Sequence, residues 1–275
     1  MKTALSIAGS DCSGGAGIQA DIKTFSAHGV FGMTVITSVV AENTFRVIEY
    51  QDVRPDIIER QIDAVFEDIP PDAVKIGMLS CRETMLAVAG ELREYSPRNV
   101  VVDPVMYAKN GCALMDPESI DALIAEIVPL ADVITPNIPE AEKMAGMEIA
   151  SRYEMEYAAR KIHSFGCRAV LVKGGHCLKK TDAAGDSIDT LYDGVEFYHY
   201  SARRVDTKNT HGTGCTLSSA IASNLALGMS LPTAVERAKT YVTTAIEHAL
   251  ELGMGNGPTH HFYDLYLAGG LIEDE

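Results

Sequence analysis

The sequence lacks tryptophan, and nothing in it approaches the apolar stretch of about 18 residues that a membrane span needs. The N-terminal apolar run is too short for a secretory signal and is followed by Gly and Asp. Basic residues are scarce, since 23 Lys and Arg stand against 38 Asp and Glu, for a formal net charge of -15 at pH 7. A field of that sign repels nucleic-acid phosphates and anionic lipids. We therefore expect a cytoplasmic protein with neither nucleic acid nor membrane as partner.

The cysteines show neither a CxxC pair nor a Cys/His spacing typical of metal sites, which argues against a disulfide framework or a zinc site. We expect reduced thiols, most of them ordinary packing residues. The composition is otherwise that of a globular protein, with 47% hydrophobic and 22% charged residues. A chain of 275 residues can bury one large core, so residues 1–275 are expected to form a single domain. The six cysteines are Cys12, Cys81, Cys112, Cys167, Cys177 and Cys215.

Strand-like apolar runs alternate with amphipathic segments of helical length along most of the chain. This rhythm predicts a parallel sheet with crossover helices. The run Thr34–Val40 is apolar and β-branched throughout, so we expect it to be a strand buried on both faces. Further strands are expected at Thr3–Ala8, Val74–Ile76, Val100–Val102, Val133–Thr135 and Ala169–Lys173, and helices at Ile18–His28, Pro55–Asp68, Arg82–Tyr95, Pro117–Val128, Pro139–Ala145 and Tyr153–Phe165.

The rhythm changes near the C-terminus. Two β-rich runs flank Asp193-Gly194 between Ser187 and Tyr200, which is the signal of a tight hairpin. We expect residues 179–201 to form a flap that orders over a substrate. Two long helices, Gly212–Leu227 and Leu231–Leu252, are expected to close the fold.

The strongest motif is DTKNTHGTGC, which ends at Cys215 and runs directly into a helix rich in small residues. Gly212 and Gly214 remove side chains from the turn, so unpaired amides and the positive end of the helix dipole face outward and can bind an anion. The same dipole is expected to lower the pKa of Cys215. The alternative is a helix end packed closely on a strand, but Lys208 and His211 beside it favour phosphate binding.

A second glycine-rich segment, GSDCSGGAG, follows the first predicted strand from Gly9 to Gly17. Its spacing fits neither the dinucleotide fingerprint GxGxxG nor the phosphate loop GxxxxGK[ST]. Such glycine density means that the backbone closely approaches either a substrate or the neighbouring helix. The sequence alone leaves both possibilities open.

Polar groups also follow the middle strands. Asp103 comes directly after one apolar strand, and Asn137 and Glu140 follow the next. Carboxylates at adjacent strand ends could hold a hydrated Mg²⁺, although Asp before Pro and Glu in a first helical turn are also common helix-start devices. Lys173 ends a further strand, where it could meet a phosphate as a point charge.

Together these segments resemble the hydroxymethylpyrimidine and phosphomethylpyrimidine kinases of thiamin synthesis, in the ribokinase-like superfamily. The resemblance runs from Thr3 to about Phe262 and rests on several collinear markers. It implies an α/β fold of the ribokinase-like three-layer α/β/α type, with a central, mainly parallel sheet and a small β flap. The markers are AGSDCSGGAGIQADIKTFSAHGVFG, KIGMLS, VDPVM, TPNIPEAE, VKGGH, DTKNTHGTGCT and GPTHHF.

The resemblance implies that ATP phosphorylates the hydroxymethyl group of 4-amino-5-hydroxymethyl-2-methylpyrimidine, and then the resulting monophosphate. It implies an anion hole at Gly212, Thr213, Gly214 and Cys215, with Cys215 helping to deprotonate the substrate. It places Mg²⁺ near Asp103 and Glu140, and the nucleotide phosphates near Asn137, Lys173, Gly175, Lys208, Thr210 and Lys239. The pyrimidine pocket implied by the family comprises Gly9, Ala16, Asp21, Val40, Glu42, Met78 and Val105. A homodimer is also implied.

One position departs from the family pattern. Many relatives read AQNT where this chain has AENT, so Glu42 replaces an amide that would pair with the pyrimidine edge. An ionised carboxylate accepts hydrogen bonds but cannot donate one. Kinases of pyridoxal or pyridoxine share the glycine-rich turn, so vitamin B6 phosphorylation is the alternative activity. Two alternatives outside the kinases are a thiol hydrolase that uses Cys215 with His211, and a non-catalytic pyrimidine sensor.

Overall fold

A central sheet organises the part of the chain that the computed structural model describes, namely residues 1–108, 111–175 and 186–273. Within these residues the sheet has eight strands in the order β10-β9-β8-β7-β6-β5-β1-β2. The strands from β8 to β2 run parallel, whereas β9 and β10 are antiparallel. They are β1 (Thr3–Ala8), β2 (Phe31–Ile36), β5 (Ala73–Ile76), β6 (Val100–Val102), β7 (Val133–Ile134), β8 (Val170–Val172), β9 (Asp186–Tyr192) and β10 (Phe197–Arg203).

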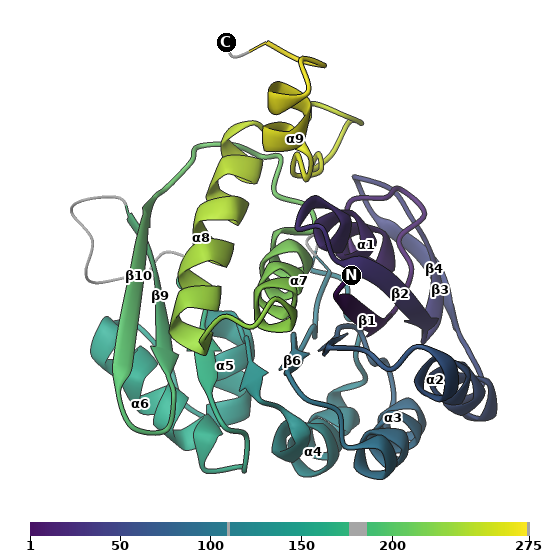
Figure 1. Cartoon of the computed structure of the whole chain (residues 1–275). Helices are drawn as coiled ribbons and strands as arrows, with labels where there is room; N and C mark the ends of the chain where they lie inside the picture. The colour runs from purple at the N-terminus through teal and green to yellow at the C-terminus, as the bar shows by residue number, and fades with distance from the viewer. Residues whose placement is uncertain (109–110, 176–185, 274–275) are drawn as a thin grey trace.

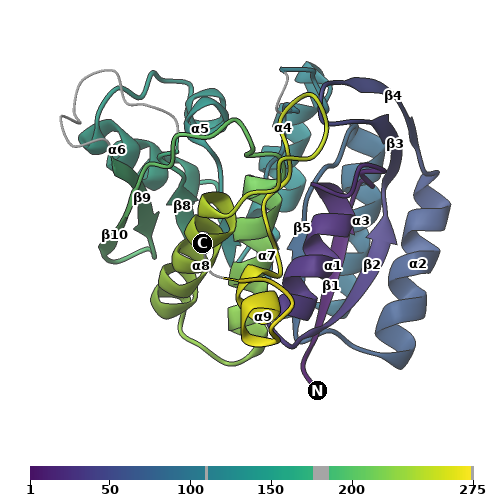
Figure 2. The same ribbon diagram turned by 90° about the horizontal axis from the view of Figure 1, so that it is seen from above.

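Helices cover both faces of this sheet, as Figures 1 and 2 show. Successive side chains of a strand point to opposite faces of the sheet, so each strand contributes to two hydrophobic cores. Leu5 and Ile7 pack with Ile58 on one face, and Ala4 packs with Phe25 and Ile221 on the other. The first core uses α2 (Pro55–Asp68), α3 (Arg82–Tyr95), α4 (Ile120–Ala122), α5 (Ile138–Ala145) and α6 (Arg152–His163); the second uses α1 (Gly17–Ala27), α7 (Thr213–Ala226) and α8 (Leu231–Glu247). The predicted three-layer α/β/α fold is confirmed.

The segment Thr34–Val40 was expected to be one doubly buried strand, and this prediction is wrong. Strand β2 ends at Ile36 and forms the edge of the large sheet, whereas β3 (Ser38–Glu42) pairs with β4 (Val47–Asp52) in a separate antiparallel sheet. Thr37 makes the break, because its amide donates to the carbonyl of Ala8 and its hydroxyl to the carbonyl of Met78. The run is continuous in sequence, but its two halves serve different sheets.

The predicted turn at Asp193-Gly194 is confirmed. Strands β9 and β10 pair in register, the carboxylate of Asp193 accepts from the amides of Val195 and Glu196, and Gly194 has a φ of +94°. The hairpin does not form a separate flap, however, because β9 also pairs with β8 and so extends the central sheet. Residues 179–185 of the expected flap lie outside the described residues. The small sheet that is separate from the central sheet is instead the β3–β4 pair.

Two predicted helices differ from their expected form. The stretch from Pro117 to Leu130 is helical but irregular, with a 3₁₀ turn at each end and a π segment at Leu123–Ile127. Pro129 lacks an N–H group and so cannot continue regular α-helical bonding there. Helix α8 ends at Glu247, before the expected Leu252. A last short helix, α9 (Tyr263–Ala268), lies near the C-terminus, and no helix among the described residues is long and apolar enough to cross a membrane.

A fully buried ion pair and two serine hydroxyls join four elements, β1, β5, α1 and α7, beneath the carboxyl ends of the strands. Lys75 of β5 donates to both carboxylate oxygens of Asp21 in α1, at 2.8 and 2.9 Å. The hydroxyls of Ser6 and Ser219 donate to the same carboxylate, at 2.6 and 2.7 Å. Burial alone would lower the pKa of Lys75, but the charge of Asp21 raises it above its usual value. The pair is therefore ionised and fixes α1 and α7 against the sheet.

Replacing Lys75 by Met should destabilise the protein by about 3–5 kcal/mol, because the carboxylate of Asp21 would remain buried without its cation. The free energy of unfolding in urea measures this loss. Lys2→Met is the matched control, since the Lys2–Asp72 pair at 2.6 Å is half-exposed and should contribute less than about 1 kcal/mol. Equal losses for the two variants would show that the buried pair has no special role.

Candidate active site

A large cleft of about 1060 Å³ opens at the carboxyl ends of the parallel strands. This is the edge where open α/β sheets bind ligands. The cleft brings together nearly all of the residues that the sequence analysis selected. Those that line it are Gly9, Ala16, Val40, Glu42, Met78, Asp103, Val105, Asn137, Glu140, Lys173, Gly175, Thr210, Gly212, Thr213, Gly214, Cys215 and Lys239.

Two predicted residues do not line the cleft. Asp21 is completely buried, because its carboxylate is held by Lys75 and two serine hydroxyls below the cleft floor. It cannot contact a pyrimidine directly in this arrangement. Lys208 is exposed on the loop before α7, and its side chain is not part of the cleft wall.

The turn at the start of α7 has the form expected of an anion hole. Gly212 is the N-cap residue with a φ of +76°, and no side chain caps the helix. A Cβ at Gly212 would lie 1.8 Å from the carbonyl oxygen of Gly15, so only glycine fits. A Cβ at Gly214 would lie 3.2 Å from Oδ2 of Asp103 and 3.4 Å from Nζ of Lys173. The bare turn therefore lies directly beside the carboxylate of Asp103 and the ammonium group of Lys173.

Asp103 and Lys173 form a largely buried ion pair at 2.6 Å. The same oxygen of Asp103, Oδ1, accepts a hydrogen bond from the hydroxyl of Thr135 at 3.3 Å. Its other oxygen, Oδ2, faces the bare turn at Gly214. Burial would lower the pKa of Lys173, but the charges of Asp103 and Glu140 raise it, so the ammonium group stays charged. A cation that could bind a phosphate and an oxygen that could ligate a metal thus lie side by side.

Glu140 takes part in the N-terminal cap of α5. Its carboxylate accepts from the amide of Asn137 at 2.7 Å, and the side-chain oxygen of Asn137 accepts from the amide of Glu140 at 2.9 Å. This is a capping box, so the helix-start interpretation holds for both residues. Burial raises the pKa of Glu140 to about 7, Lys173 opposes the rise and Asp103 adds to it. A cation near these two carboxylates would relieve their repulsion, so the donor set fits Mg²⁺.

Cys215 lies in the first turn of α7, as expected, but its thiol is not activated. Burial raises the pKa of Cys215 to about 11, and the charges of Asp21 and Asp103 add to the rise. The ammonium group of Lys75 acts in the opposite direction without cancelling these effects. The expectation of a lowered thiol pKa is therefore wrong, because removal of water outweighs the charge of Lys75 and the hydrogen bond from the backbone of Gly17, which both act to lower it.

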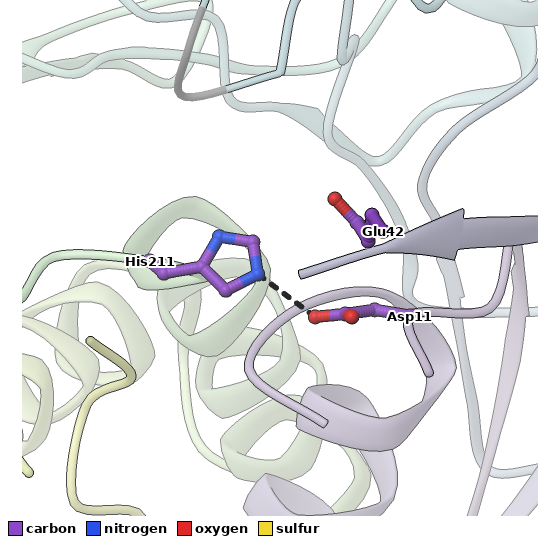
Figure 3. Close-up of side chains that lie close together, drawn as sticks. All are labelled: Asp11, Glu42 and His211. Carbon is purple, nitrogen blue, oxygen red and sulfur yellow. Dashed lines mark hydrogen bonds and ion pairs between the residues drawn. The ribbon is translucent and has the colours of Figure 1, made fainter. Parts of the chain in front are cut away.

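Asp11, Glu42 and His211 meet at the side of the cleft, as Figure 3 shows. The Nε2 atom of His211 lies 2.8 Å from Oδ2 of Asp11, and one ligand atom from each of the three residues lies within 4.8 Å of the others. Burial raises the pKa of Glu42 to about 7, the charge of Asp11 raises it further and His211 opposes the rise. His211 thus bonds Asp11 rather than Cys215, which counts against the thiol-hydrolase alternative.

Sequence reasoning missed several residues of the cleft. Lys75 lies in the short buried strand AVKI, and a lysine in such a run indicates a buried partner, so a signal was present. Val242 and Ile246 of α8 form an apolar wall, yet they resemble any other core positions of an amphipathic helix. Lys239, on the same helix, reaches the cleft but donates to Asp189 at 2.9 Å, a pairing that no spacing in the sequence indicates.

The comparisons with known proteins agree with this geometry. The family model for phosphomethylpyrimidine kinase matches residues 11–260. A hydroxymethylpyrimidine/phosphomethylpyrimidine kinase of Rhizobium meliloti is 52% identical, covering 94% of this chain and 97% of that protein. The thiamine biosynthesis bifunctional protein ThiED of Geobacter sulfurreducens is 50% identical over 94% of this chain, which spans about half (51%) of that longer protein.

Solved structures show the same likeness. The phosphomethylpyrimidine kinase of Clostridium difficile has a TM-score of 0.79 and 47% identity, covering 90% of this chain and 100% of that one. An ADP complex of the Bacillus subtilis pyridoxal kinase has a TM-score of 0.86 and 39% identity, covering 95% and 98%. The chain is a phosphotransferase, and it belongs to the phosphomethylpyrimidine kinase family.

Proposed function

We propose that this enzyme transfers the terminal phosphoryl group of ATP to 4-amino-5-hydroxymethyl-2-methylpyrimidine and then to its monophosphate. The observation that carries the proposal is the bare turn Gly212–Cys215, which faces Lys173 and Asp103 across one cleft. Phosphoryl transfer needs alignment and charge neutralisation more than covalent chemistry. Unpaired amides, a buried ammonium group and a carboxylate supply both.

The two ends of the cleft suit the two substrates. One end combines the apolar wall of Val242 and Ile246 with Lys239, and we assign the nucleotide to it. The other end is lined by Gly9, Glu42 and Met78, and we assign the pyrimidine to it. Between them lie the groups proposed for the phosphates, which are Asn137, Lys173, Gly175 and Thr210, with the exposed Lys208 able to approach only from the rim.

Mg²⁺ is the proposed cofactor, held by Asp103 with Glu140 behind it. When bound, it would neutralise charge on the phosphate oxygens. Lys173 holds the transferring group as a point charge, and the amides of the α7 turn meet charge that develops on its oxygens. In its thiolate form, Cys215 is proposed to receive the proton of the substrate hydroxyl late in the transfer. Because the raised pKa keeps most of this thiol protonated, the contribution is minor beside positioning.

The small β3–β4 sheet offers a surface for a second copy of the chain. Val39, Phe45 and Ile48 of this sheet and its turn are 58%, 67% and 62% exposed, and so many exposed apolar groups on one small sheet favour an interface. We propose that two copies of the chain form a homodimer through the β3–β4 sheet.

Sedimentation should give twice the mass of the chain for the wild type, and the mass of one chain for Phe45→Glu. The same wild-type and variant mass would contradict this assignment.

We also propose a cytoplasmic location. Cys12, Cys81, Cys167 and Cys215 carry free thiols, which is usual in a reducing compartment.

The ATP-kinase proposal is tested by ADP release with four acceptors: the aminopyrimidine alcohol, its monophosphate, pyridoxine and pyridoxal. We expect turnover with the two pyrimidines that requires Mg²⁺. Vitamin B6 phosphorylation is the second candidate, favoured by the likeness to the Bacillus subtilis pyridoxal kinase. Faster release with pyridoxal would support that candidate, and tight pyrimidine binding without any ADP release would indicate a sensor.

The pH dependence of pyrimidine binding should report the protonation state of Glu42. Below its pKa of about 7 the neutral carboxyl can both donate and accept, as an amide does, and above it the O–H donor is lost. The KM for the aminopyrimidine should therefore rise roughly tenfold between about pH 7 and about pH 9. Glu42→Gln should remove this rise and leave the KM for ATP unchanged. An equal rise in wild type and variant would show that Glu42 does not meet the pyrimidine edge.

A further inference from the structure

Asp11 holds the glycine-rich segment after β1 in one conformation. Its Oδ1 accepts from the amide and the hydroxyl of Ser13, both at 2.7 Å. Its Oδ2 accepts from the amides of Gly15 and Ala16, at 2.9 and 2.7 Å. The fifth partner is the imidazole of His211, 200 residues away in the chain. Burial alone would raise the pKa of Asp11, but His211 and the other donors lower it well below its usual value.

The contact between these two segments is closely packed. A Cβ at Gly15 would lie 2.3 Å from Cδ2 of His211, and one at Gly212 would lie 1.8 Å from the carbonyl oxygen of Gly15. On its other side, the backbone amide of His211 donates to the carbonyl of Gly257 at 3.1 Å. The turn that begins α7 is therefore seated on the segment after β1, and the Asp11–His211 bond closes the contact.

The same cluster does not make a good metal site. Asp11, Glu42 and His211 offer ligand atoms close together, but both oxygens of Asp11 are already occupied by donors of the protein. A metal would have to displace hydrogen bonds that shape the segment. The arrangement instead fits a neutral or charged imidazole whose Nε2–H donates to a carboxylate, which orients the ring.

We propose that Asp11 and His211 form a positioning pair that holds the anion-hole turn of α7 in register with the substrate-binding segment after β1. This role of the pair rests on the proposed kinase function. His211 directly precedes Gly212, so any movement of its ring is passed to the amides of the turn. The pair acts through the turn and is not required to touch either substrate.

Loss of the pair should affect turnover more than binding. A displacement of about 1 Å in a phosphoryl-transfer site can cost about 100-fold in rate. We therefore expect His211→Ala to lower kcat by about 10- to 100-fold, with the KM values for ATP and acceptor changing less than about threefold, because the turn acts mainly in the transition state. Asp11→Ala should have a similar effect on kcat.

A double-mutant cycle distinguishes positioning from two independent effects. If one bond is responsible, the double variant should be no slower than about the slower single variant, whereas independent roles would multiply. His211→Gln can still donate an N–H to Asp11 and should recover most of the lost kcat. His199→Ala is the matched control, since His199 pairs with Glu156 at 3.3 Å on a partly exposed surface and should leave kcat unchanged.

A second measurement keeps the pairing testable if a variant folds poorly or if the kinase proposal fails. The amides of His211, Thr213 and Thr216 donate to the carbonyls of Gly257, Thr210 and Gly212. Hydrogen exchange of these three amides should rise in His211→Ala and rise less in the milder His211→Gln, while exchange in β5 and β6 stays at the wild-type level. Multiplicative rate losses, losses confined to KM, or unchanged exchange in the turn would overturn the pairing. If the wild type releases no ADP with any acceptor, the kinase proposal fails, and the exchange result alone decides the pairing.

Discussion

The functional arrangement depends on the close approach of two backbone segments at one end of the sheet. Gly212 can lie against the carbonyl of Gly15 only because neither position carries a side chain that would intervene. No side chain caps the first turn of α7, and Gly214 in that turn lies next to Asp103 and Lys173. An uncapped helix end is costly unless another group satisfies its amides, and a bound anion can do so.

Buried charge supports that geometry from below. The Lys75–Asp21 pair fixes α1 and α7 to β5, and Lys173–Asp103 fixes the ends of β8 and β6 relative to each other. Both ion pairs are shielded from water, so what each contributes to stability depends on the geometry of its hydrogen bonds more than on how many pairs there are. The same loss of water explains why Cys215 has a raised rather than a lowered pKa. A site that excludes water thus keeps this thiol protonated, so little thiolate is present to accept a proton.

The order of most strands and helices could be predicted from the sequence, because apolar periodicity is a local signal. Glycine-rich turns and polar residues at strand ends indicated the α7 turn, Asp103, Asn137, Glu140 and Lys173, whereas the residues expected to line the pyrimidine pocket came from the resemblance to the family. Features that depend on contacts between distant parts of the chain could not be predicted. Nothing local indicates that Thr37 divides one β-rich run between two sheets, or that the hairpin at Asp193 extends the large sheet. The burial of Asp21 was likewise hidden, because its partner Lys75 lies 54 residues away. Electrostatic environment is a property of the assembled fold, and so the thiol of Cys215 was misjudged.

The capping box at Asn137 and Glu140 has a consequence for replacements of Glu140. One carboxylate both starts α5 and lies beside Asp103 at the proposed cation site. Replacing Glu140 by alanine would remove a helix cap and a negative charge together, whereas glutamine could keep the cap and remove only the charge. The start of α5 and the charge beside Asp103 are thus linked through one side chain, and the two effects can be separated by a change of a single functional group.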